Sequence, residues 1–265
     1  MLSLYMKIIH YILSLAVASL IFTIEAHGTS VKSDYPYAEA EKYISKILEK
    51  PIPYSKQILN VTWTINDHQT YPAGSLTQLF ASYLMDNNLI QDKIVADIGS
   101  SGFTIGVLAA KNGAKEVVGT CITPESAKNA RENIASNHVE EITQVLDGSG
   151  ADPLLPKYKG KVDVIVSGPP WNTISKEDIN NVPESRKALS RLFYDTDDRI
   201  INNVLSKAPE LLAPEGKIYM TASLKIMERV KSLCRTSHMS YKIVQEKDIH
   251  HDGNIHYILM LTPEK

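Results

Sequence analysis

Two hydrophobic periodicities alternate along the chain after residue 70. Short apolar runs of strand length occupy residues 93–100, 116–122, 142–147, 161–167 and 218–222. Segments with apolar residues at helical spacing lie between or beside them, at residues 76–87, 103–111, 125–137, 196–212 and 224–236. Strands that alternate with helices in this way predict βα units that share one parallel sheet.

The last part of the chain has a different pattern. Two apolar runs, at residues 241–249 and 255–261, follow each other around Asp252-Gly253, and an Asp-Gly pair there predicts a tight hairpin. We therefore predict an α/β fold: a Rossmann-like doubly wound sheet, mostly parallel, with a C-terminal antiparallel hairpin strand.

The N-terminal part divides into two predicted segments before the main domain at residues 71–265. Residues 1–26 resemble a signal peptide or membrane anchor, because residues 8–24 are almost wholly apolar and Glu25-Ala26 leads into polar sequence. We expect a secreted or membrane-anchored protein, with a cytoplasmic location as the alternative. Residues 27–70 form an extension with a helix at 37–50 and a strand or hairpin arm at 57–65.

Charge and cysteine content exclude some classes of protein. The net charge of −2 over 265 residues gives no strong signal for nucleic-acid binding. The two cysteines, Cys121 and Cys234, are far apart in predicted core segments, so a disulfide framework is not expected. His250, His251 and His256 are interpreted as residues of a solvated turn, and no metal site is predicted.

Residues 93–123 form the predicted centre of the domain: strand, glycine and serine turn, helix, strand. Asp97 and Gly99 close the first strand, and Ser101 and Gly102 continue the turn. Such a turn at the carboxyl end of a strand predicts a cofactor pocket, because the N–H groups of the next helix point into it. Asp97 either hydrogen-bonds a cofactor amine or orders the turn.

A second candidate site follows the strand at 161–167. Pro169 and Pro170 form a rigid wall, and Trp171 offers a flat face to a substrate ring or amide. Gly168 precedes them and has no side chain to contribute.

These segments together resemble the class I S-adenosylmethionine-dependent methyltransferases over residues 71–262. VADIGSSG resembles the family's first motif, and NGAKEVVGTCITPESAKNARENI resembles the second strand and next helix of ribosomal-protein and release-factor methyltransferases. LLAPEGKIYM resembles the turn before the fifth strand. VDVIVSGPPW resembles the Asn-Pro-Pro-aromatic motif of enzymes that methylate planar nitrogens, and YPAGSLTQ resembles the segment that precedes the fold in those enzymes.

The resemblance implies S-adenosyl-L-methionine as cofactor and methyl transfer to a nitrogen on a protein, an RNA or a small molecule. It assigns the methyl acceptor, whose identity is unknown, to Gly168, Pro169, Pro170 and Trp171. Cofactor contacts are implied at the turn, the ribose position and the adenine position: Asp97, Gly99, Ser101, Gly102, Cys121, Ile122, Asp147 and Gly148. Membrane association through residues 8–24 is a further expectation.

Three residues depart from the family pattern. Phe103 stands where the turn usually has its third glycine, so its ring either turns away from the ligand or narrows the pocket. Cys121 stands where an acid commonly holds the ribose, and Gly168 replaces the asparagine. These departures motivate the alternative, a catalytically degenerate methyltransferase-fold binding module. A nucleotide-linked oxidoreductase shares the turn but also lacks the acid at position 121.

Overall fold

A computed structural model describes residues 42, 44–71, 73–182, 187, 190–196 and 199–264. The segment 1–26 and most of the helix expected at 37–50 lie outside the described residues, although residue 42 and residues 44–48 are helical. Residues 44–265 form one compact unit. Within the described part of the chain, no helix has the length and apolar character needed to cross a membrane.

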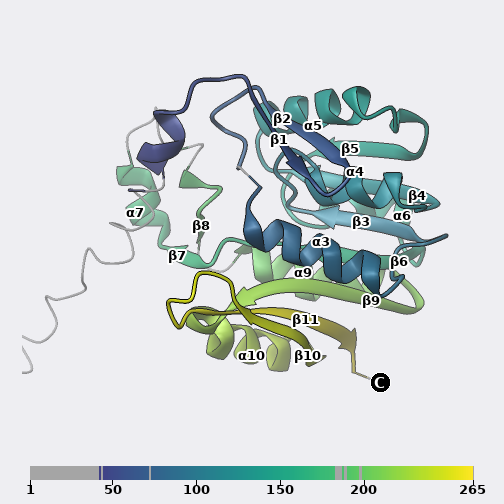
Figure 1. The fold of residues 1–265 in the computed structure, drawn as a ribbon. Coiled ribbons are helices and arrows are strands. Elements are labelled where there is room, and N and C mark those ends of the chain that lie inside the picture. The colour runs from purple at the N-terminus through teal and green to yellow at the C-terminus, as the bar shows by residue number, and fades with distance from the viewer. Residues whose placement is uncertain are drawn as a thin grey trace, which may run out of the picture. The chain divides into compact units, whose positions relative to one another are not determined.

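One sheet of seven strands organises this unit (Figure 1). Its strands lie in the spatial order β5 (Thr143–Asp147), β4 (Glu116–Cys121), β3 (Ile94–Ile98), β6 (Val162–Ser167), β9 (Leu212–Ser223), β11 (Ile255–Pro263) and β10 (Met239–Asp248). The first five are mutually parallel, and β11 runs antiparallel to both of its neighbours. The predicted fold class is confirmed.

Helices cover both faces of the sheet because successive strand residues point to opposite sides. One core is shared with α3 (Ser75–Asp86), α4 (Thr104–Lys111), α5 (Pro124–Ser136) and the hairpin of β1 (Tyr54–Ile58) and β2 (Val61–Ile65). The other core is shared with α6 (Leu155–Tyr158), α9 (Arg199–Leu211) and α10 (Met227–Thr236). Short 3₁₀ turns η1 (Glu140–Ile142), η2 (Asp152–Leu154) and η3 (Leu224–Ile226) complete these connections.

The described residues between Trp171 and α9 include two short strands and a short helix. The strands β7 (Asn172–Ile174) and β8 (Tyr194–Thr196) pair in parallel, and α7 (Lys176–Asn181) lies between them in sequence. The buried carboxylate of Asp195 then accepts hydrogen bonds from the N–H groups of Ile200 and Ile201 at the start of α9. Strands of three residues are too short to show a periodicity, so the sequence pattern does not reveal them.

Helix and turn signals in the sequence agree with the structure in part. Thr123 stands just before Pro124 and caps α5, since its hydroxyl accepts from the N–H of Ser126. Ser75 is of a residue type that favours the cap position, yet Gly74 holds this position in α3 and Ser75 is the first helical residue. The C-terminal hairpin is confirmed, because β10 and β11 pair antiparallel, but the prediction of a tight turn is wrong: residues 249–254 form a longer loop, in which the N–H groups of Asp252 and Gly253 donate to the carboxylate of Asp248.

Candidate active site

The carboxyl ends of β4, β3 and β6 meet at one edge of the sheet (Figure 1). Ile98 pairs with Thr120 on one side and with Ser167 on the other. The residues that follow these three are therefore neighbours, since adjacent strands lie about 4.8 Å apart. In this way the fold brings Gly99, Cys121 and Gly168 together at one edge.

The turn at Gly99 leaves open space beside its backbone. Gly99 has a φ of +74°, and a Cβ built at this position would meet no atom within 4 Å. Its N–H donates to Oγ1 of Thr120 at 3.2 Å, which fixes the turn against β4. A glycine with this φ and a free flank is the arrangement that lets a ligand approach the main chain closely.

Asp97 orders this turn. Its side chain is buried, and its Oδ2 accepts the N–H of Gly106 in the first turn of α4 at 2.9 Å. Burial raises the pKa of Asp97 from 3.8 to about 6, while hydrogen bonds from Ser100 and Gly106 oppose the rise. Of the two roles predicted for Asp97, these contacts serve the ordering of the turn.

The raised pKa of Asp97 predicts a pH dependence of stability. Between pH 4 and 6 the native protein binds a proton that the unfolded chain has released, so the free energy of unfolding should fall as the pH rises through this window. The full difference is roughly 3 kcal/mol. Asp97→Asn, which can still accept from Gly106, should remove this slope in urea unfolding measured from pH 4 to 8. An equal slope in both proteins would assign the effect to another group.

Ser101 and Gly102 make contacts within the protein. The hydroxyl of Ser101 accepts the N–H of Tyr71 at 2.7 Å. The carbonyl of Gly102 accepts from Nε1 of Trp63 at 3.2 Å and from Nδ2 of Asn133 at 3.1 Å. A Cβ on Gly102 would lie 2.8 Å from the Trp63 ring. The second half of the turn is thus anchored to the β1–β2 hairpin.

Phe103 turns its ring away from the edge of the sheet. It is fully buried in left-handed backbone, with a φ of 63°, which is unusual for a bulky residue. Its ring lies between Gly106 in α4 and Gly119 in β4, because a Cβ at either glycine would come within 2.4 Å of it. Gly119 pairs with Asp97, one residue before the last pair of β3 and β4. The Phe103 ring therefore fills the core beneath the turn and does not enter the space beside Gly99.

Cys121, at the ribose position implied by the resemblance, carries a protonated thiol. It is fully buried, and its Sγ donates to the carbonyl of Ser100 at 2.7 Å. Burial raises the pKa of this thiol to about 12, and the negative charge of Asp97 adds to the effect. Ile122 follows and is half-buried. The end of β4 therefore offers no carboxylate at this position.

The loop after β5 is tied to the end of β4. The N–H of Gly148 donates to the carbonyl of Cys121 at 2.9 Å, and Oγ1 of Thr120 donates to the carbonyl of Gly150 at 2.8 Å. The carboxylate of Asp147 forms a 2.6 Å ion pair with Nη2 of Arg131 in α5. Both side chains of this pair are largely exposed, so the pair remains open to exchange with a ligand.

Gly168, Pro169, Pro170 and Trp171 follow the end of β6. A Cβ at Gly168 would meet only Oγ1 of Thr221, at an ordinary 3.5 Å, so the backbone has room for a side chain here. Arg229 of α10 donates to the carbonyl of Trp171 at 3.4 Å and also to the hydroxyl of Thr173. The Trp171 ring centre lies 5.2 Å from that of His256.

Sequence reasoning missed three residues beside this wall: Thr221, Ser223 and His256. His256 was placed in a solvated turn, but it is 3% exposed in β11. Burial is the main cause that lowers its pKa, and His250 lowers it further. The sequence did carry a signal for the burial of His256. It stands two residues before the apolar Ile258, and residues two apart in a strand lie on the same face.

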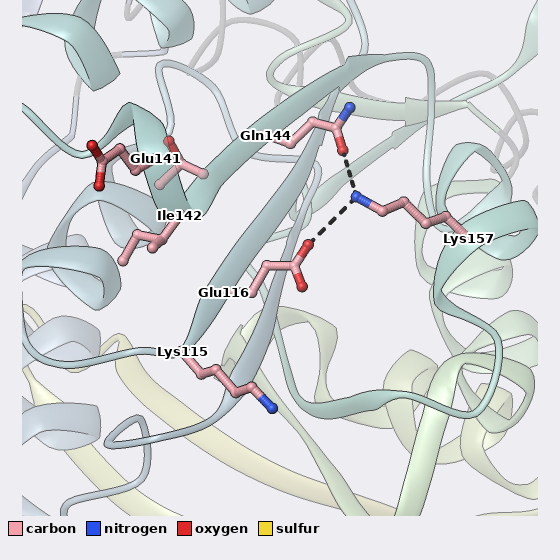
Figure 2. A pocket seen from close by; sticks show the side chains of 7 residues that line it. Lys115, Glu116, Glu141, Ile142, Gln144 and Lys157 are labelled. Carbon is pink, nitrogen blue, oxygen red and sulfur yellow. Dashed lines mark hydrogen bonds and ion pairs between the residues drawn. The ribbon is translucent and has the colours of Figure 1, made fainter.

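A polar pocket lies at the opposite edge of the sheet (Figure 2). Glu116 at the start of β4 and Gln144 in β5 both reach Lys157, with its Nζ 3.5 Å and 3.3 Å from their oxygens. Ligands of open α/β sheets bind at the carboxyl ends of the strands, whereas this pocket lies at the amino end of β4. We therefore assign no part of the active site to it.

Comparison with known proteins identifies the superfamily. Residues 74–169, which include the turn at Gly99 and the end of β6, match the family of ribosomal protein L11 methyltransferase (PrmA). The chain belongs to the class I S-adenosylmethionine-dependent methyltransferase superfamily. S-adenosylmethionine is the cofactor of this superfamily.

Individual members of this superfamily resemble the chain over part of their length. Ribosomal protein L11 methyltransferase of Clostridium perfringens is 30% identical over 165 residues, which cover 58% of this chain and 48% of that protein. Release factor glutamine methyltransferase of Borreliella burgdorferi is 22% identical over 202 residues, 73% of this chain and 69% of that protein. TYW2 of P. horikoshii, solved with MeSAdo, shares the fold with a TM-score of 0.53 and 14% identity over 80% of this chain and 71% of its own.

The residues at the carboxyl ends of the strands suit the amino-acid end of this cofactor better than its ribose. The open flank of Gly99 leaves the main chain accessible, as a bound amino-acid group requires. At the end of β4 the thiol of Cys121 is uncharged and committed to Ser100. The turn therefore leaves room for the cofactor, whereas position 121 offers its ribose no charged hydrogen-bond acceptor.

Proposed function

We propose that this chain is a methyltransferase that transfers a methyl group from S-adenosylmethionine to a nitrogen of a protein acceptor. One observation carries the proposal: the open glycine turn after β3 and the Gly168–Trp171 wall after β6 follow strands that pair directly. A cofactor at the first and an acceptor at the second are thereby held side by side. Methyl transfer depends mainly on this alignment.

The chain's own residues support the reaction by position rather than by covalent chemistry. The turn at Gly99 would receive the amino-acid end of the cofactor, and the β4 and β5 ends would receive its ribose and adenine. When bound, S-adenosylmethionine would supply the methyl group: the acceptor nitrogen would bond to the methyl carbon as the carbon–sulfur bond breaks with its electrons left on sulfur, and the nitrogen would release its proton to solvent water. Pro169 is buried and Pro170 half-buried, so the backbone of the wall that positions the acceptor is rigid.

Relatives favour a protein nitrogen as the acceptor. The two relatives described above are named as a ribosomal-protein methyltransferase and a glutamine methyltransferase. A third, from Methanocaldococcus jannaschii, is named as a protein N5-glutamine methyltransferase and is 29% identical over 168 residues. The chain's small net charge agrees with a protein more than with a nucleic-acid acceptor. Export or membrane attachment through residues 8–24 stays a prediction from the sequence.

Calorimetry of the purified full-length chain with S-adenosylhomocysteine is the first test. Saturable heat is expected. The absence of heat with ligand at about 1 mM would end the proposal, because it excludes even a binding free energy of about 4 kcal/mol.

Incubation with methyl-tritiated S-adenosylmethionine and matched protein and RNA fractions is the second test. Label in protein that survives ribonuclease treatment is expected. Binding without transfer to either fraction would favour the degenerate binding module.

Cys121 provides a prediction specific to the cofactor. Cys121→Asp should bind S-adenosylhomocysteine about 10- to 100-fold more tightly, because a carboxylate can accept the ribose hydroxyls with charge-assisted hydrogen bonds. The same variant should be less stable without ligand, since its carboxylate would face the carbonyl of Ser100 and the charge of Asp97. Cys121→Asn, which has the same shape and no charge, is the matched control in calorimetry. Equal affinities of Asp and Asn variants would mean that position 121 does not limit binding.

A further inference from the structure

A row of polar side chains continues from the acceptor wall across β9 and β11. Thr221 pairs with Ile258, and Ser223 pairs with His256. Residues two apart on a strand, and residues opposite each other on paired strands, share one face, so all three polar side chains lie on the same side of the sheet. The row begins beside Gly168, whose nearest neighbour across the empty side-chain position is Oγ1 of Thr221.

This row contains buried polar atoms that have no hydrogen-bond partner among the described residues. Thr221, Ser223 and His256 are 3%, 0% and 3% exposed. Among the described residues, neither Oγ of Ser223 nor Nδ1 of His256 has a hydrogen-bond partner. Leaving such groups buried and unpaired costs stability, and native proteins keep few of them. A fold tolerates this cost most readily where the groups serve a ligand.

The row is neutral, and it is rich in hydrogen-bond acceptors. Burial and the nearby His250 lower the pKa of His256, while Asp248, Asp252 and the carbonyl of Lys247 oppose them with smaller effects. The imidazole is therefore uncharged near pH 7 and has one nitrogen that accepts. The hydroxyls of Thr221 and Ser223 accept as well. A ligand group with N–H bonds and no charge matches this chemistry.

We propose that Thr221, Ser223 and His256 form the subsite that binds the N–H group of the methyl acceptor, in place of the side chain that Gly168 lacks. This inference rests on the proposed function and adds the residues that position the acceptor. The ligand class is an uncharged nitrogen bearing hydrogen, as in a primary carboxamide. A protonated amine finds no carboxylate within the row. Because Trp171 lies on His256, the acceptor has to displace its ring to reach the row.

The test uses the full-length chain saturated with S-adenosylhomocysteine and N-acetylglutamine amide as the uncharged probe. The imidazole signals of His256 in nuclear magnetic resonance spectra should shift saturably with this probe and should not shift with butylammonium. Ser223→Ala and His256→Phe should each weaken binding of the amide about tenfold, since each leaves a buried N–H group of the probe unpaired. Both variants should retain the affinity for S-adenosylhomocysteine.

Thermal stability separates this role from a structural one. Ser223→Ala removes the only polar atom of a side chain that has no partner, so it should raise the melting temperature, by about 2–4 °C for a domain of this size. A residue that only supports the fold would lower it. His138→Asn is the matched control. His138 is exposed, lies just after α5 in left-handed backbone, and should change neither the melting temperature nor the affinity for the amide when it is replaced. Gly168→Asn, added to His256→Phe, should restore part of the lost affinity.

The outcomes distinguish the inference from the function on which it rests. If S-adenosylhomocysteine binds but the amide leaves the His256 signals unmoved, the subsite is wrong and the methyltransferase proposal stands. Unchanged affinity for the amide in both variants, or a preference for butylammonium, also overturns the subsite. If S-adenosylhomocysteine does not bind, the proposed function fails and the subsite fails with it. Should His256→Phe not fold, Ser223→Ala decides, because it removes only one oxygen atom.

Discussion

Valine at position 99 is expected to lower the affinity for S-adenosylhomocysteine by more than about 100-fold. Gly99 has open space on the flank where a Cβ would stand, so the valine methyl groups would occupy the volume that the ligand needs. The φ of +74° adds backbone strain for any residue with a side chain. Calorimetry with S-adenosylhomocysteine measures the affinity, and urea unfolding measures the strain.

Gly160→Val is the matched control for this prediction. Gly160 has a similar φ of +68° and also has no atom within 4 Å of a Cβ position, but it lies in the turn before β6, at the amino end of that strand. Both variants should lose a similar amount of stability, on the order of 1–2 kcal/mol. Only Gly99→Val should lose binding. Equal binding by both variants would place the cofactor away from the turn, and the proposed function would lose its main support.

Alanine at position 119 is expected to lower the free energy of unfolding by about 3 kcal/mol. Its Cβ would stand 2.3 Å from the Phe103 ring and 2.9 Å from the carbonyl oxygen of Asp97. The ring is enclosed on its other side by Gly106, so it has no room to retreat. The carbonyl belongs to the neighbouring strand and cannot move without breaking the pairing of β3 and β4.

A double-mutant cycle tests whether Phe103 and Gly119 are coupled. Phe103→Ala alone should cost about 3–5 kcal/mol, because it empties a buried ring site. Combined with Gly119→Ala, the total loss should be smaller than the sum of the two single losses by at least about 1 kcal/mol, since the new methyl group then enters the vacated space. Gly168→Ala, with its nearest neighbour at 3.5 Å, is the control and should be nearly neutral in urea unfolding. Strict additivity would show that the clash is with the backbone alone.

This coupling resolves the question that Phe103 raised. In the related pattern a third glycine lets the helix approach the strand closely. Here the approach is filled by a ring, and glycines at positions 106 and 119 supply the space for it. The pocket edge therefore remains open although the turn carries a bulky residue. The departure at position 103 repositions atoms in the core and does not argue against a cofactor.

The departures at positions 121 and 168 have different consequences. Cys121 removes a charge from the ribose position and uses its thiol within the protein, so it weakens the cofactor site. Gly168 lacks the hydrogen-bond acceptor that an asparagine side chain would provide, but it leaves space that Thr221 borders, and the polar row of β9 and β11 lies next to it. The subsite for the methyl acceptor is therefore built from different residues but keeps the hydrogen-bond acceptors that an N–H group requires.

The sequence alone determined the fold class, the order of the main elements and the edge at which the site lies. Hydrophobic periodicity and a glycine turn are local signals, and the βα alternation permits few topologies, so residues such as Gly99 and Trp171 could be singled out without coordinates. The tertiary structure alone decided where the Phe103 ring lies, which partner the Cys121 thiol has, and that His256 lies against Trp171 on one side and pairs with Ser223 on the other. Each of these depends on strand register and on side chains distant in sequence, and no local pattern encodes such a contact.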